Sequence, residues 1–308
     1  MIYTMTLNPS IDYYVYVDPF QVGCLNRMTK DEKYPGGKGI NVSRVLSRIG
    51  VPTKALGFIG GFTGQYIQDL LNNEGIDTDF VQVEGDTRIN IKLKTGEETE
   101  INGTGPAISE DKLHELLDKI EEMSNCDTLV LAGSIPSSLD AGLYGDIMRR
   151  CLDKGIRVVV DTSGKAMLEL LTYRPFLTKP NQYELGEFFN VNIESLEEVL
   201  RYGRQLVEMG AQHVIVSMAG DGAVLITKEA AYVANVPQGK VINSVGAGDS
   251  LVAGFIGTYA VKGSIQEAFA YGVATGSATA FSNDLCKKEY IEELLPQIKL
   301  TQVGERTS

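Results

Sequence analysis

The sequence predicts an α/β fold, with a mostly parallel central sheet covered by helices on both faces. Three observations lead to this prediction. Short apolar runs alternate along the chain with amphipathic helical segments, as in a buried parallel sheet. One segment, 88–94, instead alternates strictly between apolar and polar residues, which is typical of a half-exposed antiparallel strand. The length of 308 residues allows one large domain or two ordinary ones.

Each element of the main sheet has its own sequence signal. A first strand is expected at 2–7, and a helix at 39–48 follows a run of glycines. The other buried strands are expected at 128–132, 157–161, 213–217, 223–227 and 231–236, the last two forming a hairpin. The helices are expected at 143–152, 165–171, 196–209, 247–261, 265–281 and 290–298. With no internal repeat and no long linker, we expect a single domain over residues 1–308.

The alternating segment predicts a second, smaller sheet. In it, Ile89, Ile91 and Leu93 lie on one face, and the opposite face carries Arg88, Asn90, Lys92 and Lys94. Residues 12–17 show a similar pattern, so we expect a small sheet built from about 12–33 and 88–103 to project from the body. An exposed apolar face needs a cover, and a second copy of the chain is the simplest one. We therefore expect a homodimer formed through this sheet.

Composition excludes several classes of function. The chain has 28 Lys and Arg against 40 Asp and Glu, a net charge of −12, which disfavours nucleic-acid binding because phosphate contacts supply most of that affinity. No apolar run approaches the roughly 20 residues that span a bilayer, and the first residues lack a basic signal region, so we expect a cytoplasmic protein that does not bind membranes. Four scattered cysteines and two histidines give no metal-binding pattern. Glycine is in excess, with 33 residues, and its clusters hold the functional signals.

The sharpest glycine cluster opens a strongly apolar helix near residue 247. Gly246 and Gly248 flank one small residue, so the backbone N–H groups of Ala247, Gly248 and Asp249 can point into one concavity that binds anions. The carboxylate of Asp249 beside this site suits acid–base chemistry on a hydroxyl that approaches a phosphoryl group. The alternative is that Asp249 only caps the helix while the glycines permit tight packing. The sequence contains no dinucleotide fingerprint, P-loop, nucleophile elbow or zinc-protease motif.

A second cluster, 34–44, places three glycines around one lysine. The glycines let the main chain approach a small polyol closely, with Lys38 and Asn41 within its reach. The alternative is a flexible loop with a solvated lysine, which fits less well because a proline precedes the cluster and a helix follows it. Residues 57–64 and 217–222 are further glycine turns, and neither carries a prediction alone.

Three segments, taken in order, carry a family resemblance. Residues 36–41, 179–184 and 245–249 resemble the three signatures of the PfkB/ribokinase family of ATP-dependent sugar kinases, and the agreement extends over essentially the whole chain. Residues 6–12 and 87–94 are similar to the branch of that family that acts on phosphorylated ketohexoses. The resemblance implies a ribokinase-like, three-layer α/β/α fold. It also implies that the small sheet is a lid that closes over the sugar and excludes water.

The resemblance assigns roles around the transferred phosphoryl group. It makes Asp249 the base that takes the proton of the acceptor hydroxyl, and the amides of Ala247 and Gly248 hold the charge on the phosphoryl group. Gly246 belongs to the same catalytic motif. A carboxylate at a helix N-terminus is expected to be a weak base, because the helix dipole favours its anion. ATP is implied as the phosphoryl donor, and the nucleotide contacts are Lys179, Asn181, Ser217, Gly220, Gly222, Gly248 and Asn283. Asn181 and Glu184 match the family's N-x-x-E motif, which organises Mg²⁺ through water; without the other motifs, a helix cap and a surface glutamate would be the better interpretation.

The resemblance assigns the substrate side of the site in the same way. The implied contacts to sugar hydroxyls are Asp12, Gly36, Gly37 and Asn41. The phosphate already present on the substrate is implied to lie against Arg27, Arg88 and Ser134, with Lys38 and Asn90 nearby. The implied reaction converts fructose 1-phosphate to fructose 1,6-bisphosphate, although fructose 6-phosphate and tagatose 6-phosphate fit the same chemistry. An alternative of another class is a non-catalytic sensor of sugar phosphates or nucleotides, against which the intact base and N-x-x-E motif argue.

Overall fold

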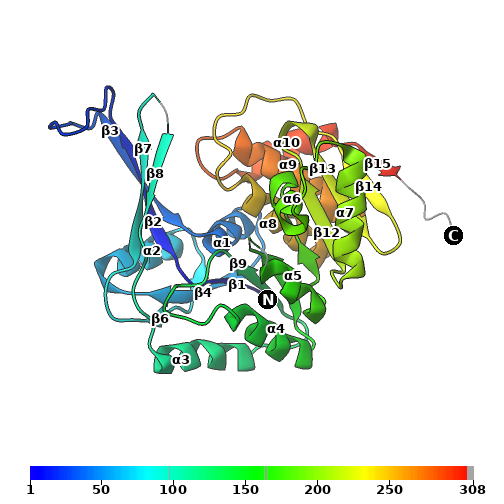
Figure 1. Cartoon of the computed structure of the whole chain (residues 1–308), viewed down its shortest axis with the longest axis horizontal. Helices are drawn as coiled ribbons and strands as arrows, with labels where there is room; N and C mark the ends of the chain where they lie inside the picture. The colour runs from blue at the N-terminus through cyan, green and yellow to red at the C-terminus, as the bar shows by residue number, and fades with distance from the viewer. Residues whose placement is uncertain (97, 163, 165, 304–308) are drawn as a thin grey trace.

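Parallel strands form the centre of the molecule in the computed structural model, which describes residues 1–96, 98–162, 164 and 166–303 (Figure 1). Within these residues, 11 strands form one sheet in the order β15-β14-β13-β12-β11-β10-β9-β1-β4-β5, with β6 beside β4. Their bounds are β1 Ile2–Thr6, β4 Thr53–Ile59, β5 Asp77–Thr78, β6 Val81–Gln82, β9 Thr128–Ala132, β10 Arg157–Asp161, β11 Leu177–Thr178, β12 His213–Ser217, β13 Ala223–Thr227, β14 Ala231–Ala234 and β15 Leu300–Val303. Only the pairs that include β13, β14 or β15 are antiparallel. The mostly parallel sheet is therefore confirmed.

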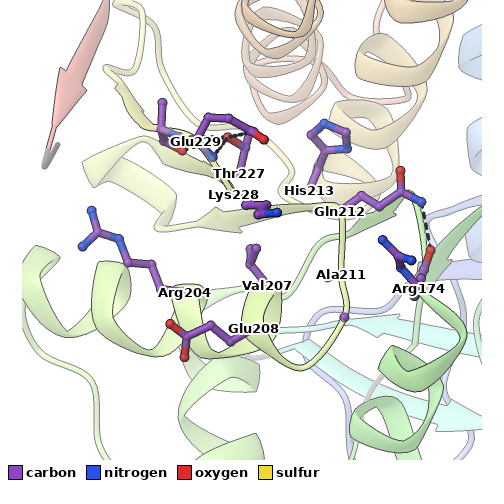
Figure 2. A pocket seen from close by; sticks show the side chains of 12 residues that line it. Arg174, Arg204, Val207, Glu208, Ala211, Gln212, His213, Thr227, Lys228 and Glu229 are labelled. Carbon is purple, nitrogen blue, oxygen red and sulfur yellow. Dashed lines mark hydrogen bonds between the residues drawn. The ribbon is translucent and has the colours of Figure 1, made fainter. Parts of the chain in front are cut away.

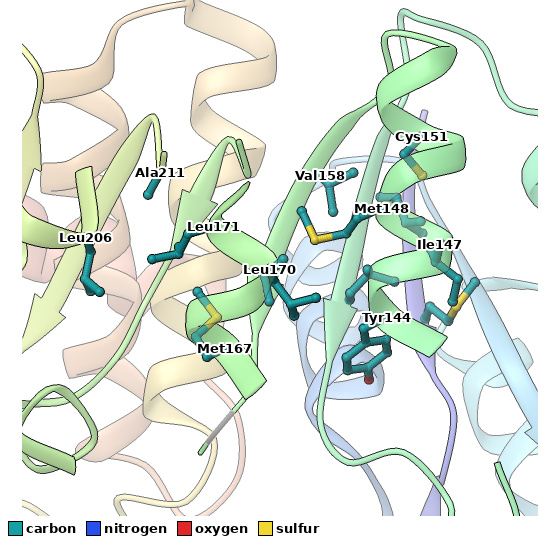
Figure 3. Packing of buried hydrophobic residues seen from close by; sticks show 14 of the residues in the cluster. Tyr144, Ile147, Met148, Cys151, Val158, Met167, Leu170, Leu171, Leu206 and Ala211 are labelled. Carbon is teal, nitrogen blue, oxygen red and sulfur yellow. The ribbon is translucent and has the colours of Figure 1, made fainter. Parts of the chain in front are cut away.

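Helices cover both faces of this sheet, as predicted. Their bounds are α1 Lys38–Arg48, α2 Gly61–Asn73, α3 Glu110–Glu121, α4 Leu143–Asp153, α5 Ala166–Leu170, α6 Gln182–Phe189, α7 Leu196–Glu208, α8 Ala247–Lys262, α9 Ile265–Ala280 and α10 Lys288–Leu294. In β9, Leu129 and Leu131 pack into the core on the side of α3 to α7, whereas Val130 and Ala132 pack into the core on the side of α1, α8, α9 and α10. Figure 3 shows part of the first of these cores, where α4 and α5 cover the sheet. The alternation produces the three-layer α/β/α fold.

Several elements begin and end at the predicted residues, and the differences have physical causes. The strands at 128–132, 157–161, 213–217 and 223–227 match exactly. The helix expected at 290–298 ends at Leu294 and continues only as the 3₁₀ turn Leu295–Gln297, because Pro296 cannot donate an intrahelical hydrogen bond. In the helix expected at 165–171, Lys165 lies outside the described residues, and α5 covers 166–170.

The structure corrects the bounds of the glycine turn expected at 57–64. Gly57 lies inside β4 and pairs with Thr6 of β1. Its φ is +146°, and a Cβ atom there would lie 1.9 Å from the carbonyl oxygen of Thr6, so only glycine lets the two backbones approach. The turn itself begins after Ile59, where Gly60 precedes α2. In the sequence, a glycine that lets two strands approach each other therefore looks the same as a glycine in a turn.

The second sheet projects from the body beside α2 (Figure 1). Its order is β3-β2-β7-β8, with bounds β2 Ser10–Tyr16, β3 Lys30–Gly36, β7 Arg88–Lys94 and β8 Glu98–Asn102, and we call it the lid sheet. Its polar face is the buried one, since Asn90 and Lys92 are each 7% exposed. Its apolar face is open, since Ile89 is 41% and Ile101 is 56% exposed. The exposed apolar face expected from the sequence is therefore present.

The helices also bear on the expectation about membranes. Across the described part of the chain, none of them combines the length and the apolar character that crossing a bilayer requires.

Candidate active site

All but three of the predicted site residues line one cavity of about 1060 Å³ at the carboxyl ends of the parallel strands. The lid sheet lines it with Asp12, Arg88 and Asn90. The loops after the strands and the start of α1 line it with Gly37, Lys38, Asn41, Ser134, Lys179, Asn181, Glu184, Ser217, Gly220 and Gly222, and the start of α8 with Gly246, Ala247, Gly248 and Asp249. A second cavity, of about 540 Å³, opens at the amino end of β12 and contains none of these residues (Figure 2). The predicted chemistry therefore has one location.

The start of α8 has the form of an anion-binding site. Its N-cap, Gly246, has a left-handed φ of 78° and brings no side chain. A Cβ atom at Gly248 would lie 3.0 Å from Nζ of Lys179, so a side chain there would displace the lysine. The N–H of Ala247 already donates to the carbonyl of Ser244 at 3.2 Å, whereas those of Gly248 and Asp249 have no acceptor among the described residues.

Asp249 is buried, with 7% of its surface exposed, and Nδ2 of Asn41 donates to its Oδ2 at 2.8 Å. Burial, together with the charge of Asp161, raises the pKa of Asp249 to about 6. The charges of Lys38 and Lys179 and the Asn41 hydrogen bond oppose this rise. The expectation of an especially weak base is therefore wrong, because desolvation outweighs the helix dipole. At neutral pH the carboxylate is ionised and more basic than an ordinary aspartate.

Asp161 joins two lysines that line the cavity. Nζ of Lys38 donates to Oδ1 of Asp161 at 3.1 Å, and Nζ of Lys179 lies 3.9 Å from the same oxygen. Burial opposes the ionisation of Asp161, but the two ammonium groups hold its pKa below the usual range. Sequence reasoning missed Asp161 as a functional residue. Its position at the end of a parallel strand, at the same edge as the other site residues, is the signal that could have found it.

The lid sheet presents a guanidinium to the other end of the cavity. Arg88 donates from Nε to the carbonyl of Asn8 at 3.2 Å and from Nη1 to that of Gly103 at 3.1 Å. Burial lowers its pKa, against the charge of Asp12, yet no carboxylate of the described residues forms an ion pair with it. Asp12 accepts hydrogen bonds at Oδ1 from Ser10 at 2.8 Å and from Asn90 at 3.0 Å. The arginine is thus held in place by neutral groups, which suits it to bind an anion.

Asn181 and Glu184 form a capping box at the start of α6. Oδ1 of Asn181 accepts the N–H of Glu184 at 2.9 Å, and Oε2 of Glu184 accepts the N–H of Asn181 at 2.8 Å. Both residues also line the cavity. The helix-cap interpretation is therefore correct as structure, and it leaves the second carboxylate oxygen of Glu184 outside the capping contacts.

An apolar wall of the cavity was not predicted. It consists of Val236, Val241, Val245, Val273, Ala280 and Phe281. These residues come from a loop and from α9, where single apolar residues carry no recognisable sequence signal. The wall adjoins Ser217, Gly220 and Gly222, the predicted nucleotide contacts.

Three predicted site residues lie outside this cavity. Arg27 lies in the exposed loop between β2 and β3. Asn283 instead lines a smaller cavity beside Asn243, whose Nδ2 donates to its carbonyl at 3.4 Å. Gly36 packs against Asp12, because a Cβ atom there would lie 2.5 Å from the Asp12 carboxyl carbon. The loop that carries Asn283 is anchored by Arg44 and Arg48, which bind Asp284.

Comparison with known proteins agrees with this geometry. The profile of the pfkB family carbohydrate kinases matches residues 5–288. The chain belongs to this family. It is 56% identical over 303 residues to 1-phosphofructokinase of Bacillus subtilis, a match that covers 98% of this chain and all of that one. It is 38% identical to D-tagatose-1-phosphate kinase of Bacillus licheniformis, with the same coverage.

A solved structure of the pfkB family shows the same fold. The crystal structure of phosphofructokinase-2 from Escherichia coli in complex with fructose-6-phosphate superimposes with a TM-score of 0.90 at 30% identity. The match covers 96% of this chain and 98% of that one. Over the matched residues, the chain thus has the ribokinase-like α/β architecture of the pfkB family, with the smaller separate sheet.

The buried carboxylate of Asp249 should cost this pfkB protein stability. Its folded pKa of about 6 lies above the ordinary value of 3.8, so its ionised form is disfavoured in the folded state by about 3 kcal/mol. We predict that Asp249→Asn raises the free energy of unfolding at pH 7.5 by up to that amount. The gain should shrink as the pH falls through 6 and vanish below 3.8, where the carboxyl is protonated in both states.

Denaturant unfolding at several pH values measures this effect. The control is Asp118→Asn on the exposed face of α3, for which we expect a change within about 0.5 kcal/mol. A loss of stability in Asp249→Asn at pH 7.5 would show that the neighbouring lysines outweigh burial.

Proposed function

We propose that this protein transfers the γ-phosphoryl group of ATP to the 6-hydroxyl of fructose 1-phosphate, which yields fructose 1,6-bisphosphate and ADP. The observation that carries the proposal is the arrangement within one cavity of a buried carboxylate beside bare helix amides and, at the lid sheet, an arginine without an anionic partner among the described residues. The name of the Bacillus subtilis relative, 56% identical, supports the choice of substrate.

Asp249 serves as the base in this proposal. Asn41 orients the carboxylate through Oδ2, and the carboxylate takes the proton of the acceptor hydroxyl. The hydroxyl oxygen then forms a bond to the γ-phosphorus, while the bond from that phosphorus to the bridging oxygen of ADP breaks. The N–H groups of Gly248 and Asp249 neutralise charge on the transferred group. A positioned base contributes roughly 10²–10⁴-fold to such a step.

Arg88 binds the phosphate already present on the sugar, together with Ser134. Its guanidinium is positioned by backbone carbonyls and offers the remaining N–H donors to two phosphate oxygens. Asp12 and Asn90 contact sugar hydroxyls from the same sheet. Both arms of a ketohexofuranose flank the ring oxygen, so a site that binds a phosphate on one arm and activates the other can accept isomers. Fructose 6-phosphate and tagatose 6-phosphate therefore remain candidates, as does tagatose 1-phosphate, after the Bacillus licheniformis relative.

The nucleotide occupies the opposite end of the cavity. The apolar wall suits the adenine ring, and Ser217, Gly220 and Gly222 lie beside it. Lys179 reaches the phosphates, since its Nζ occupies the space beside Gly248 that a side chain there would take. The described residues offer no group of three His, Cys, Asp or Glu side chains to hold a metal. This fits Mg²⁺, which retains several waters and would be held through them by Asn181 and Glu184 while it neutralises the phosphates.

Release of ADP from ATP in the presence of each sugar tests the proposal. The panel is fructose 1-phosphate, fructose 6-phosphate, tagatose 6-phosphate, tagatose 1-phosphate and unphosphorylated fructose. We predict the highest kcat/KM for fructose 1-phosphate. We also predict that Asp249→Asn lowers kcat by at least roughly 10²-fold with little change in ATP affinity, and that Arg88→Met raises KM for the phosphosugar by about 10- to 100-fold.

The same assay contains the results that would contradict the proposal. A preference for unphosphorylated fructose would remove Arg88 from its role. Near-normal turnover by Asp249→Asn would remove the base. Binding of sugar phosphate or ATP without any turnover would favour the sensor. The Asp118→Asn variant controls for the loss of an acidic side chain outside the cavity.

The lid sheet is also the surface through which we propose a homodimer. Its open apolar face bears Ile89 and Ile101, and Val22 and Leu25 in the adjoining loop are 89% and 79% exposed. Exposed apolar side chains on one sheet are expected to be covered in solution. The proposed occupant is the lid sheet of a second copy, related by a two-fold axis.

Sedimentation velocity at micromolar concentration tests the dimer. We predict a dimer for the natural chain and a monomer for Ile89→Asp combined with Ile101→Asp. Val261→Asp is the matched control, because Val261 is 76% exposed at the end of α8, outside the lid sheet. A monomeric natural chain, or a double variant that remains a dimer, would contradict the proposal.

A further inference from the structure

The cations of the cavity form two separate groups. Arg88 belongs to the lid sheet, and the carboxylate whose negative charge stabilises its guanidinium is that of Asp12. Lys38 is the first residue of α1, and its ammonium group donates to Asp161 at the end of β10. The carboxylates whose negative charges stabilise the ammonium group of Lys38 are Asp161, Asp249 and Glu184. Lys38 therefore shares its surroundings with the proposed base rather than with the arginine.

Contacts extend this second group to the anion-binding turn. Oδ1 of Asp161 lies 3.1 Å from Nζ of Lys38 and 3.9 Å from Nζ of Lys179. Nζ of Lys179, in turn, lies 3.0 Å from the position that a Cβ atom of Gly248 would take. One carboxylate thus holds two ammonium groups, one of which occupies the space that a side chain at Gly248 would take.

We infer that Lys38 binds the phosphoryl group in transfer rather than the phosphate already on the sugar, and that Asp161 is the positioning residue that holds Lys38 and Lys179 beside it. The inference rests on the proposed function and revises the sequence-based placement of Lys38. The transferred group carries its charge on three oxygens, and two lysines fixed before the reaction can neutralise it without reorganisation.

Asp161 has a feature that a purely structural ion pair would not need. The residue is 3% exposed, and its Oδ2 has no hydrogen-bond partner in the described part of the chain. A buried oxygen without a partner costs folding free energy, on the order of 1–3 kcal/mol. Both lysines contact Oδ1, so packing and pairing leave Oδ2 unexplained, and such a buried group is typical of a functional rather than a purely structural residue.

Steady-state kinetics with fructose 1-phosphate separates the two placements of Lys38. We expect Lys38→Met to lower kcat by about 10²–10³-fold while KM for the phosphosugar changes less than about 3-fold. Arg88→Met should instead raise KM for the phosphosugar and change kcat much less. Lys38→Arg keeps the charge and should restore part of kcat. Asp161→Asn should lower kcat in the same direction as Lys38→Met.

The controls are Lys119→Met and Asp79→Asn. Nζ of Lys119 and Oδ1 of Asp79 form an equivalent, partly buried ion pair at 2.6 Å, and neither residue lines the cavity. Both variants should retain the natural kcat. Unfolding by denaturant shows which variants are folded, and the folded Lys38→Arg and Asp161→Asn proteins suffice for the comparison if Lys38→Met is not.

The pH dependence of kcat/KM provides a readout that loosened structure would not produce. The groups facing Asp249 are Asn41, Lys38, Lys179 and Asp161. Asp249 must be ionised to act, so activity falls as the pH drops through its pKa. Removal of the positive charge in Lys38→Met should move this acid limb to higher pH. Removal of the negative charge in Asp161→Asn should move it to lower pH.

Distinct results would overturn this inference and the proposed function. If Lys38→Met raises KM for fructose 1-phosphate at least about 10-fold and keeps kcat, Lys38 binds the sugar phosphate. If Asp161→Asn keeps full kcat, or if both acid limbs move in the same direction, Asp161 is not a positioning residue. If the natural protein itself releases no ADP with any sugar phosphate, the proposed function fails, and this inference fails with it.

Discussion

The burial of Asp249 among three other charges is the constraint on which the rest of the site depends. Burial of its carboxylate raises the energy of its ionisation most, and the charges of Asp161, Lys38 and Lys179 then modify that energy. These four residues come from α8, β10, α1 and the end of β11, which are distant in sequence. They meet because the carboxyl ends of parallel strands lie at one edge of the sheet. The fold thus supplies a reactive group at a cost in stability, and the lysines limit that cost.

Glycine makes this concentration of charge sterically feasible. At Gly248 the absent side chain admits the ammonium of Lys179, and at Gly57 it admits the backbone of β1 against β4. The net charge of −12 is therefore compatible with anionic ligands, because three of the 28 Lys and Arg side chains, Lys38, Arg88 and Lys179, line one cavity. Arg88 can bind one phosphate group, and the two lysines can bind the other. An acidic surface elsewhere does not weaken such buried contacts, since screening and distance reduce its influence.

Sequence patterns predicted the parallel sheet well, because buried strands are short apolar runs with clear ends. They predicted helix ends less well where one residue decides, as Pro296 does. The glycine motifs identified Asp249 and Asn41, since bare backbone beside an apolar helix is visible in a sequence. They could not identify Asp161, whose role depends on which strands become neighbours, or show that Arg27 and Asn283 lie outside the cavity. The pKa of Asp249 was misjudged because the helix dipole is a local property, whereas burial is a property of the whole fold.

Carbon-13 NMR of protein labelled at the aspartate carboxyl carbons tests the central claim most directly. The resonance that is absent from the Asp249→Asn spectrum identifies Asp249, and its chemical shift is followed from pH 4 to pH 8. The account predicts a titration with a midpoint near 6. A midpoint below about 4 would contradict it, since the lysines and the helix dipole would then dominate over burial.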